Sequence, residues 1–202
     1  PALVILTTLL SMRYLGKRKD SKVIQAAWRY EITKHRPQIR HELLNEQKGF
    51  CAYSERYVDP MDACDVEHFD PRKKGTTVDD YWNWYAVHHN VNMSKPRKIE
   101  NYLPILCPYS DDVSRRIHYA YGQFEPVDTG DQEAKNLIDF LGLNHPNVAE
   151  SRARHIKRTK ADRERFFKDD LPGFIEHLQT EITNLSYITA LEAEFGINLT
   201  VS

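Results

Sequence analysis

The chain contains the stretch Val66-Glu-His-Phe-Asp-Pro-Arg-Lys73, which decides how its fold is interpreted. The run Asp65–Phe69 has the composition of a short strand, and the Asp-Pro pair that follows it is a turn signal. Two similar aromatic runs precede it, Phe50–Tyr53 and Tyr57-Val58. Together these runs predict a two-stranded ribbon. A loop rich in Lys and Gly and a short helix at His89–Lys95 follow, which completes a small ββα unit.

The sequence on both sides of this unit predicts mainly helices. Before it, Ser21 can cap a helix that extends to Ile32, and Pro37 suits the first turn of a second helix that stops at Gly49. After it we expect a hairpin and three helices: Ile117–Tyr121 with Gln123–Val127, then a helix capped by Asp131 and closed by Gly142, a basic helix from Pro146 to about Lys168, and a last helix from Pro172. The predicted fold class is α+β, with the ββα unit embedded in a mainly helical domain.

The length of the chain limits its domain organisation, and its net charge limits how it can bind nucleic acid. A chain of 202 residues with 41% hydrophobic residues can form one compact domain or a small core with a helical extension. We divide it into an N-terminal segment with a helical preface (1–49), the ββα core (50–100) and a hairpin with a helical C-terminal region (101–202). The formal net charge is −1, whereas a free-standing nucleic-acid binder is usually basic. Any nucleic-acid contact surface must therefore be local, or a partner must supply affinity.

The N-terminus and the cysteines indicate an intracellular protein. Residues 1–10 are apolar but have no basic residue before them, and they are too few to span a bilayer as a helix. Met12 is a candidate natural start, and alternatively Leu3–Thr8 is a buried strand. Three cysteines do not form a disulfide framework in a chain of this length. In either case we expect a soluble, cytoplasmic protein with reduced thiols.

Four residues in and after the ribbon suit phosphodiester hydrolysis: Glu67, His68, Asn83 and Asn92. The reaction needs a base that deprotonates water and a cation that neutralises charge on the phosphate. A neutral imidazole such as that of His68 can be the base. A carboxylate and an amide oxygen are hard ligands that can hold Mg²⁺ or Mn²⁺ and leave coordination positions for water and phosphate.

These residues resemble the HNH, or ββα-metal, nuclease motif, and most closely the HNH proteins of the Septu anti-phage defence type. The resemblance includes the spacing from Glu67 through Asn92 to Lys95 and continues into Ile138–Asn144 and Arg152. It implies a DNA endonuclease with His68 as general base, Glu67 and Asn92 as metal ligands and Asn83 as a brace for the loop and the His ring. It also implies an effector subunit of an anti-phage defence complex, with an ATPase partner of the ABC/SMC type.

The structural zinc site of that family is the main departure. Its four ligand positions fall at Cys51, Ser54, His88 and Val91, of which only Cys51 and His88 can bind zinc. Structural zinc sites use four good ligands, so we expect that zinc is absent. Cys64 and Cys107 are alternative ligands, although neither has a paired spacing.

Basic residues flank the proposed site, and we expect Arg72, Lys73, Lys74 and Lys95 to contact nucleic acid. The basic run from Arg152 to Lys168 suits solubility or a partner surface as well as nucleic acid. Two other functions stay open. One is an RNA or tRNA nuclease, because the metal chemistry does not distinguish the sugars. The other is a catalytically weak HNH-fold module that binds nucleic acid or acts as a scaffold.

Overall fold

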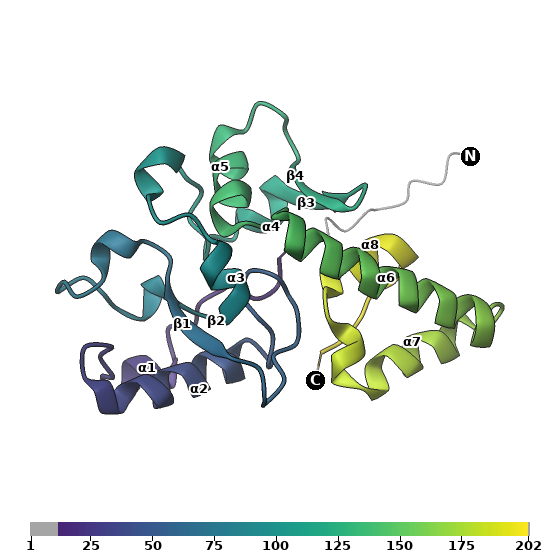
Figure 1. Cartoon of the computed structure of the whole chain (residues 1–202), viewed down its shortest axis with the longest axis horizontal. Helices are drawn as coiled ribbons and strands as arrows, with labels where there is room; N and C mark the ends of the chain where they lie inside the picture. The colour runs from purple at the N-terminus through teal and green to yellow at the C-terminus, as the bar shows by residue number, and fades with distance from the viewer. Residues whose placement is uncertain (1–11, 202) are drawn as a thin grey trace.

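The computed structural model describes residues 12–201. This range contains eight α-helices and two small antiparallel sheets, so the α+β class is confirmed. The expectation for a strand at Leu3–Thr8 lies outside the described residues. Figure 1 shows the helices and strands between residues 22 and 94 at one end of the molecule and the helices between residues 146 and 195 at the other. No helix in the described range is long and apolar enough to cross a membrane.

The first sheet consists of β1 (Cys64–His68) and β2 (Trp84–His88), which pair antiparallel from Cys64 opposite His88 to His68 opposite Trp84. Helix α3 (His89–Ser94) follows β2 directly. The expected strand near Asp65–Phe69 and helix near His89–Lys95 are therefore confirmed. The runs at Phe50–Tyr53 and Tyr57-Val58 do not form strands; they are joined only by an isolated bridge between Phe50 and Tyr57. The strand that pairs with β1 is instead the fully buried β2, because its apolar and aromatic side chains lie in the core.

The predicted helix from Ser21 to Ile32 is wrong in length. Ser21 accepts a hydrogen bond from the backbone N–H of Val23, but α1 is only Lys22–Gln25. The backbone then takes a positive φ of 50° at Ala27, which breaks the helix. An irregular segment follows, in which Trp28 and Tyr30 pack against a cluster around Trp84. Helix α2 (Arg36–Glu46) begins with Pro37 in its first turn, as expected.

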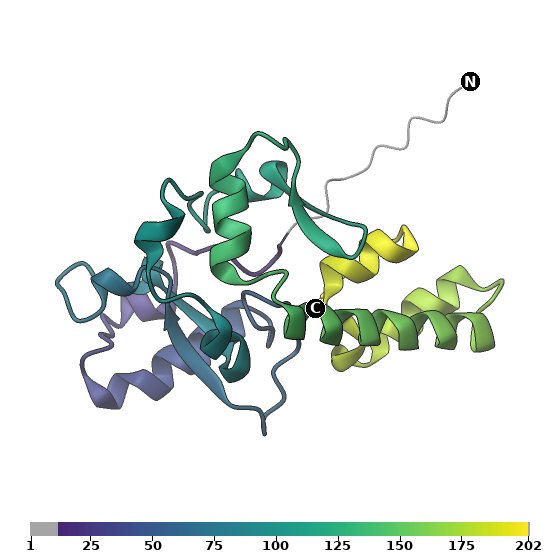
Figure 2. The same cartoon turned by 45° about the horizontal axis from the view of Figure 1, so that its top comes forward.

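The C-terminal elements follow their capping signals. Strands β3 (Ile117–Ala120) and β4 (Gln123–Pro126) form the predicted hairpin. Asp131 caps α5 (Gln132–Leu141), and Gly142 ends it with a φ of 66°, a left-handed conformation in which glycine is favoured. The remaining helices are α4 (Val113–Arg116), α6 (Pro146–Phe166), α7 (Leu171–Thr180) and α8 (Ile188–Phe195), of which α4 and α8 were not predicted. In Figure 2, α6 and α7 remain side by side.

One hydrophobic cluster contains buried residues from all three predicted segments, for example Leu15, Tyr85 and Leu191. A buried carboxylate also joins the segments. The side chain of Glu55 accepts hydrogen bonds from the backbone N–H of Arg13 (2.9 Å) and from both the N–H (3.0 Å) and the hydroxyl (2.8 Å) of Thr189. The packing thus ties the N-terminal segment and α8 to the turn that precedes β1.

Candidate active site

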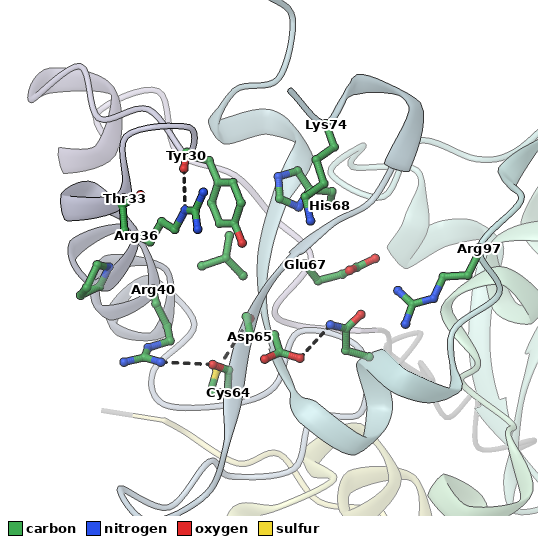
Figure 3. Close-up of a pocket in the computed structure, with 13 residues that line it drawn as sticks. Tyr30, Thr33, Arg36, Arg40, Cys64, Asp65, Glu67, His68, Lys74 and Arg97 are labelled. Carbon is green, nitrogen blue, oxygen red and sulfur yellow. Dashed lines mark hydrogen bonds between the residues drawn. The ribbon is translucent and has the colours of Figure 1, made fainter. Parts of the chain in front are cut away.

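Glu67 and His68 lie at the end of β1, beside a cavity at the free edge of this strand. Only β2 pairs with this strand in the described structure, and its other edge borders a cavity of about 430 Å³. The segment between α1 and α2 contributes Tyr30 to the cavity, and α2 contributes Arg36 and Arg40. Figure 3 shows His68, Lys74 and Tyr30 on one side of β1 and Glu67 and Arg97 on the other.

Glu67 is buried and forms an ion pair with a lysine. Its Oε1 lies 2.9 Å from Nζ of Lys95, and the side chains are 8% and 2% exposed. The same ammonium donates to the backbone carbonyl of Phe69 (3.3 Å) and lies over the ring of Phe140. Burial lowers the pKa of Lys95, and the charge of Glu67 raises it. Lys95, which we expected at a nucleic-acid surface, is instead a buried partner of the predicted metal ligand.

Asn92 lines the same cavity as Glu67. Its Nδ2 donates to Oδ2 of Asp65 (2.8 Å), whereas its Oδ1 is buried and has no hydrogen-bond partner in the described structure. Asp65 and Glu67 are two residues apart on a strand and therefore point to one face. Two carboxylates and an unpartnered amide oxygen around one cavity are a suitable donor set for a hard divalent cation. These residues therefore fit Mg²⁺ or Mn²⁺.

His68 is buried at the end of β1, with 3% of its surface exposed. Burial lowers its pKa to about 4, an effect that Lys74 and Lys95 add to and that Asp79 opposes. The imidazole is therefore neutral at pH 7. The Tyr30 ring lies edge-on to it, with 4.5 Å between the ring centroids. A neutral imidazole at a cavity wall has the protonation state that a general base requires.

Asn83 forms hydrogen bonds with the loop that follows β1. Its Oδ1 accepts from the backbone N–H of Asp70 (2.8 Å), and its Nδ2 donates to the carbonyl of Asp70 (3.1 Å) and to Oδ1 of Asp79 (3.3 Å). Asp79 in turn lies beside His68, with 3.2 Å between Oδ2 and Nε2. Asn83 therefore holds the loop directly and reaches the His68 ring only through Asp79.

Four cations around the cavity lack a carboxylate partner. Within the described range, Arg36, Arg40, Lys74 and Arg97 form no ion pair, although most arginines elsewhere do. Among the described residues that line the cavity, only Asp65 and Glu67 have carboxylates, and Glu67 is already paired with Lys95. The cavity therefore carries an excess of positive charge in a chain whose net charge is −1.

The other residues that we predicted to contact nucleic acid differ in whether they are free to do so. Arg72 is held by both oxygens of Asp70 (2.9 and 2.8 Å), whereas Lys74 lies in the cavity wall. Lys73 is half-buried and does not line the cavity. Four residues of the site were not predicted from the sequence, because their segments carry no motif: Tyr30, Arg36, Arg40 and Asp79. For Arg36 and Arg40, the i, i+4 spacing on a predicted helix was the available signal.

The positions that the resemblance to HNH nucleases assigns to zinc ligands lie in or beside a second cavity. The backbone N–H of His88 donates to Sγ of Cys51 (3.3 Å), and Ser54, His88 and Val91 line a cavity of about 280 Å³. Nη1 of Arg56 lies 3.2 Å from Nε2 of His88. Serine and valine do not supply the missing ligands, and both ring nitrogens of His88 have protein partners: the guanidinium of Arg56 at Nε2, and the backbone N–H of Asn90 at Nδ1 (3.3 Å). The residues present do not fit a structural zinc ion.

Cys64 and Cys107 do not complete this site. Cys64 lines the first cavity, Cys107 is exposed, and all three cysteines are free thiols. Within the described range, no three His, Cys, Asp or Glu side chains form a metal-binding group.

No family model matches the chain, and neither does any curated protein or solved structure.

Proposed function

We propose that the chain is a divalent-metal-dependent endonuclease of the HNH type that hydrolyses phosphodiester bonds of DNA. The observation that supports this proposal is that Glu67, His68 and Asn92 all line one cavity, and that Oδ1 of Asn92 has no hydrogen-bond partner among the described residues. The order β1, β2, α3 is the one that the resemblance to ββα-metal nucleases implies. The uncompensated cations of the cavity support an anionic substrate.

Each residue of the site has a distinct part in this reaction. Neutral His68 accepts a proton from a water molecule, which then attacks the phosphorus atom. Glu67 and Asn92 would hold Mg²⁺ or Mn²⁺, with Asp65 beside them; this ion supplies charge neutralisation at the phosphate and the leaving oxygen. Arg36, Arg40, Lys74 and Arg97 bind phosphates of the strand on either side of the reacting one.

The role in the cell is a further part of the proposal. We propose an effector subunit of an anti-phage defence complex, recruited by an ATPase of the ABC/SMC type. The support is the resemblance of the motif together with the net charge of −1, which suits a subunit that a partner brings to DNA. Copurification from native expression, followed by identification of any bound ATPase, tests this part separately from the chemistry.

The second candidate function is an HNH-fold module without strong catalysis. Two observations favour it: Lys95 already neutralises Glu67, and the residues at the zinc positions do not fit zinc. An RNA nuclease is the alternative within the enzyme class. The same assay separates the three if it includes supercoiled plasmid and a labelled RNA as substrates.

A plasmid-nicking assay with His68→Ala and Glu67→Gln tests the proposal. Loss of a general base typically costs about 10²–10⁴-fold in rate, so His68→Ala should lose nearly all cleavage while retaining its fold. Glu67→Gln keeps the size and one oxygen, and should show weak activity that partly recovers at high Mn²⁺. The exposed His41 provides the control variant His41→Ala, which should cut like the wild type. Cleavage by His68→Ala at the wild-type rate, or wild-type cleavage in EDTA, would refute the proposal.

A further inference from the structure

We infer that Asp79 is a positioning residue that holds His68 in the tautomer with the proton on Nε2, so that Nδ1 is the atom that accepts the proton. This inference rests on the proposed function, because it assigns the atom of the base that reacts. Asp79 belongs to none of the motif positions on which the resemblance rests.

The inference is based on the groups around Nε2 of His68. This atom is buried and forms no hydrogen bond of regular geometry in the described structure. Oδ2 of Asp79 nevertheless lies 3.2 Å from it, and the side chains are only 4% and 2% exposed. This distance is that of a hydrogen bond, so the contact lacks only the alignment of the N–H with the oxygen. Hydrogen bonds of catalytic groups are often poorly aligned in the free enzyme and tighten when substrate binds.

The charge of Asp79 selects the tautomer. A neutral imidazole has one N–H and one lone pair. If the proton were on Nδ1, the lone pair of Nε2 would lie 3.2 Å from a buried carboxylate oxygen, which is repulsive. With the proton on Nε2, the two groups attract each other and the lone pair of Nδ1 is free. None of the described residues forms a hydrogen bond with Nδ1 of His68.

Asp79 itself is fixed by three donors. Its Oδ1 accepts from the indole N–H of Trp84 (2.7 Å) and from Nδ2 of Asn83 (3.3 Å), and its Oδ2 accepts from the backbone N–H of Gly75 (3.1 Å). These contacts join the start of β2 and the loop after β1. The carboxylate therefore cannot turn away from His68 without breaking hydrogen bonds in a buried place.

The proton balance of the step follows from this arrangement. Nδ1 of His68 takes one proton from water, and the resulting hydroxide oxygen forms a bond to phosphorus while the bond to the leaving oxygen breaks. Solvent water protonates the leaving oxygen. The imidazolium that forms is stabilised by the charge of Asp79 and returns its proton to solvent after the product leaves.

Asp79→Asn is the sharpest test. Oδ1 receives two donors from the protein, so the asparagine oxygen should stay on that side, and its NH₂ group should face Nε2. His68 would then carry its proton on Nδ1. By analogy with the same substitution in catalytic triads, kcat should fall by up to about 10⁴-fold, with a small change in KM. The neighbouring Asp80 provides the matched control: it is exposed and caps the turn at Tyr81–Asn83, which asparagine also does. Asp80→Asn should leave the tautomer and the rate unchanged.

The tautomer is measured directly by ¹⁵N NMR of the ring at pH 7.5, with the His68 signals assigned from a His68→Gln sample. The wild type should show Nε2–H and the Asp79→Asn variant Nδ1–H. A wild-type spectrum with Nδ1–H overturns the inference even if Asp79→Asn does not fold. Wild-type cleavage by a folded Asp79→Asn also overturns it, and leaves the proposed function intact. Because the NMR measurement does not depend on activity, failure of the proposed function is seen separately in the His68→Ala assay.

Discussion

Nζ of Lys95 lies 2.9 Å from Oε1 of Glu67, so a buried ammonium contacts the carboxylate that we propose as a metal ligand. Both groups are almost fully removed from solvent, and each would be costly to bury alone. A divalent cation at Glu67 must therefore either share this carboxylate with Lys95 or move the ammonium aside. The pair gives the site a stable form without metal.

Lys95→Met should test this competition. The variant leaves the charge of Glu67 without its partner, which for a buried pair typically costs about 3–5 kcal/mol of stability. Added Mn²⁺ can then replace the lost charge and should raise the melting temperature more in the variant than in the wild type. Thermal unfolding with EDTA and with Mn²⁺ measures both effects, and Lys98→Met on the exposed surface is the control. An equal response to Mn²⁺ in Lys95→Met and the wild type would argue against a metal at Glu67.

The residues around the second cavity allow a prediction of how much zinc the purified protein contains. Because Ser54 and Val91 supply no strong ligand and Arg56 lies 3.2 Å from Nε2 of His88, zinc should be far below one atom per chain. Elemental analysis after purification without chelators checks this. A content near one zinc per chain would contradict the expectation and would require Cys64 or Cys107 to move toward the site.

Arg152 should be important for stability. Its guanidinium is buried, donates to the carbonyls of Leu143 (3.0 Å) and Gly122 (3.1 Å), and lies over the rings of Tyr119 and Phe124. Lysine has no planar group with several donors, so Arg152→Lys should lose about 1.5–3 kcal/mol, the usual contribution of a hydrogen bond to a charged group.

Urea unfolding of Arg152→Lys measures this loss. Arg154 is exposed and two residues further along α6, and Arg154→Lys should change stability by less than about 0.5 kcal/mol. Equal stabilities of the two variants would show that the buried arginine does not hold the hairpin to α6.

His155 should make stability depend on pH. Burial lowers its pKa, and Nε2 lies 3.1 Å from the carbonyl of Asn184. The pKa in the folded state is thus below the unfolded value of about 6.5. Above pH 6.5 the ring is neutral in both states, and its contribution to the free energy of unfolding is complete. As the pH falls below 6.5, the unfolded chain binds the proton more readily, and this contribution is lost.

His155→Gln keeps an N–H donor but does not titrate, so comparison with this variant isolates the pH dependence that His155 contributes to stability. The stability advantage of the wild type over this variant, measured by urea unfolding, should be smaller at pH 5.5 than at pH 7.5. A constant difference between the two pH values would mean that His155 titrates alike in the folded and unfolded chains.

The sequence by itself determined the elements whose signals are local. The caps Asp131 and Gly142 and the proline at 146 place α5 and α6, because capping depends on residues within one turn. The position of β1 and of α3 also followed from short patterns, and these two elements carry Glu67, His68 and Asn92. The helix from Ser21 was predicted too long because helical spacing up to Ile32 did not reveal the positive φ at Ala27.

Only the tertiary structure decided which charges in the site are paired and which are free. In the sequence, Lys95 and Lys74 are alike, yet Lys95 is buried against Glu67, whereas Lys74 lines the cavity and forms no ion pair with any described residue. The contact of Asp79 with His68 and that of Arg56 with His88 join residues 11 and 32 positions apart. Such contacts depend on how the loops pack around the β1–β2 sheet, and a long-range pair leaves no periodic pattern in a single sequence. Arg36 and Arg40 belong to the site for the same reason: α2 packs beside the free edge of β1.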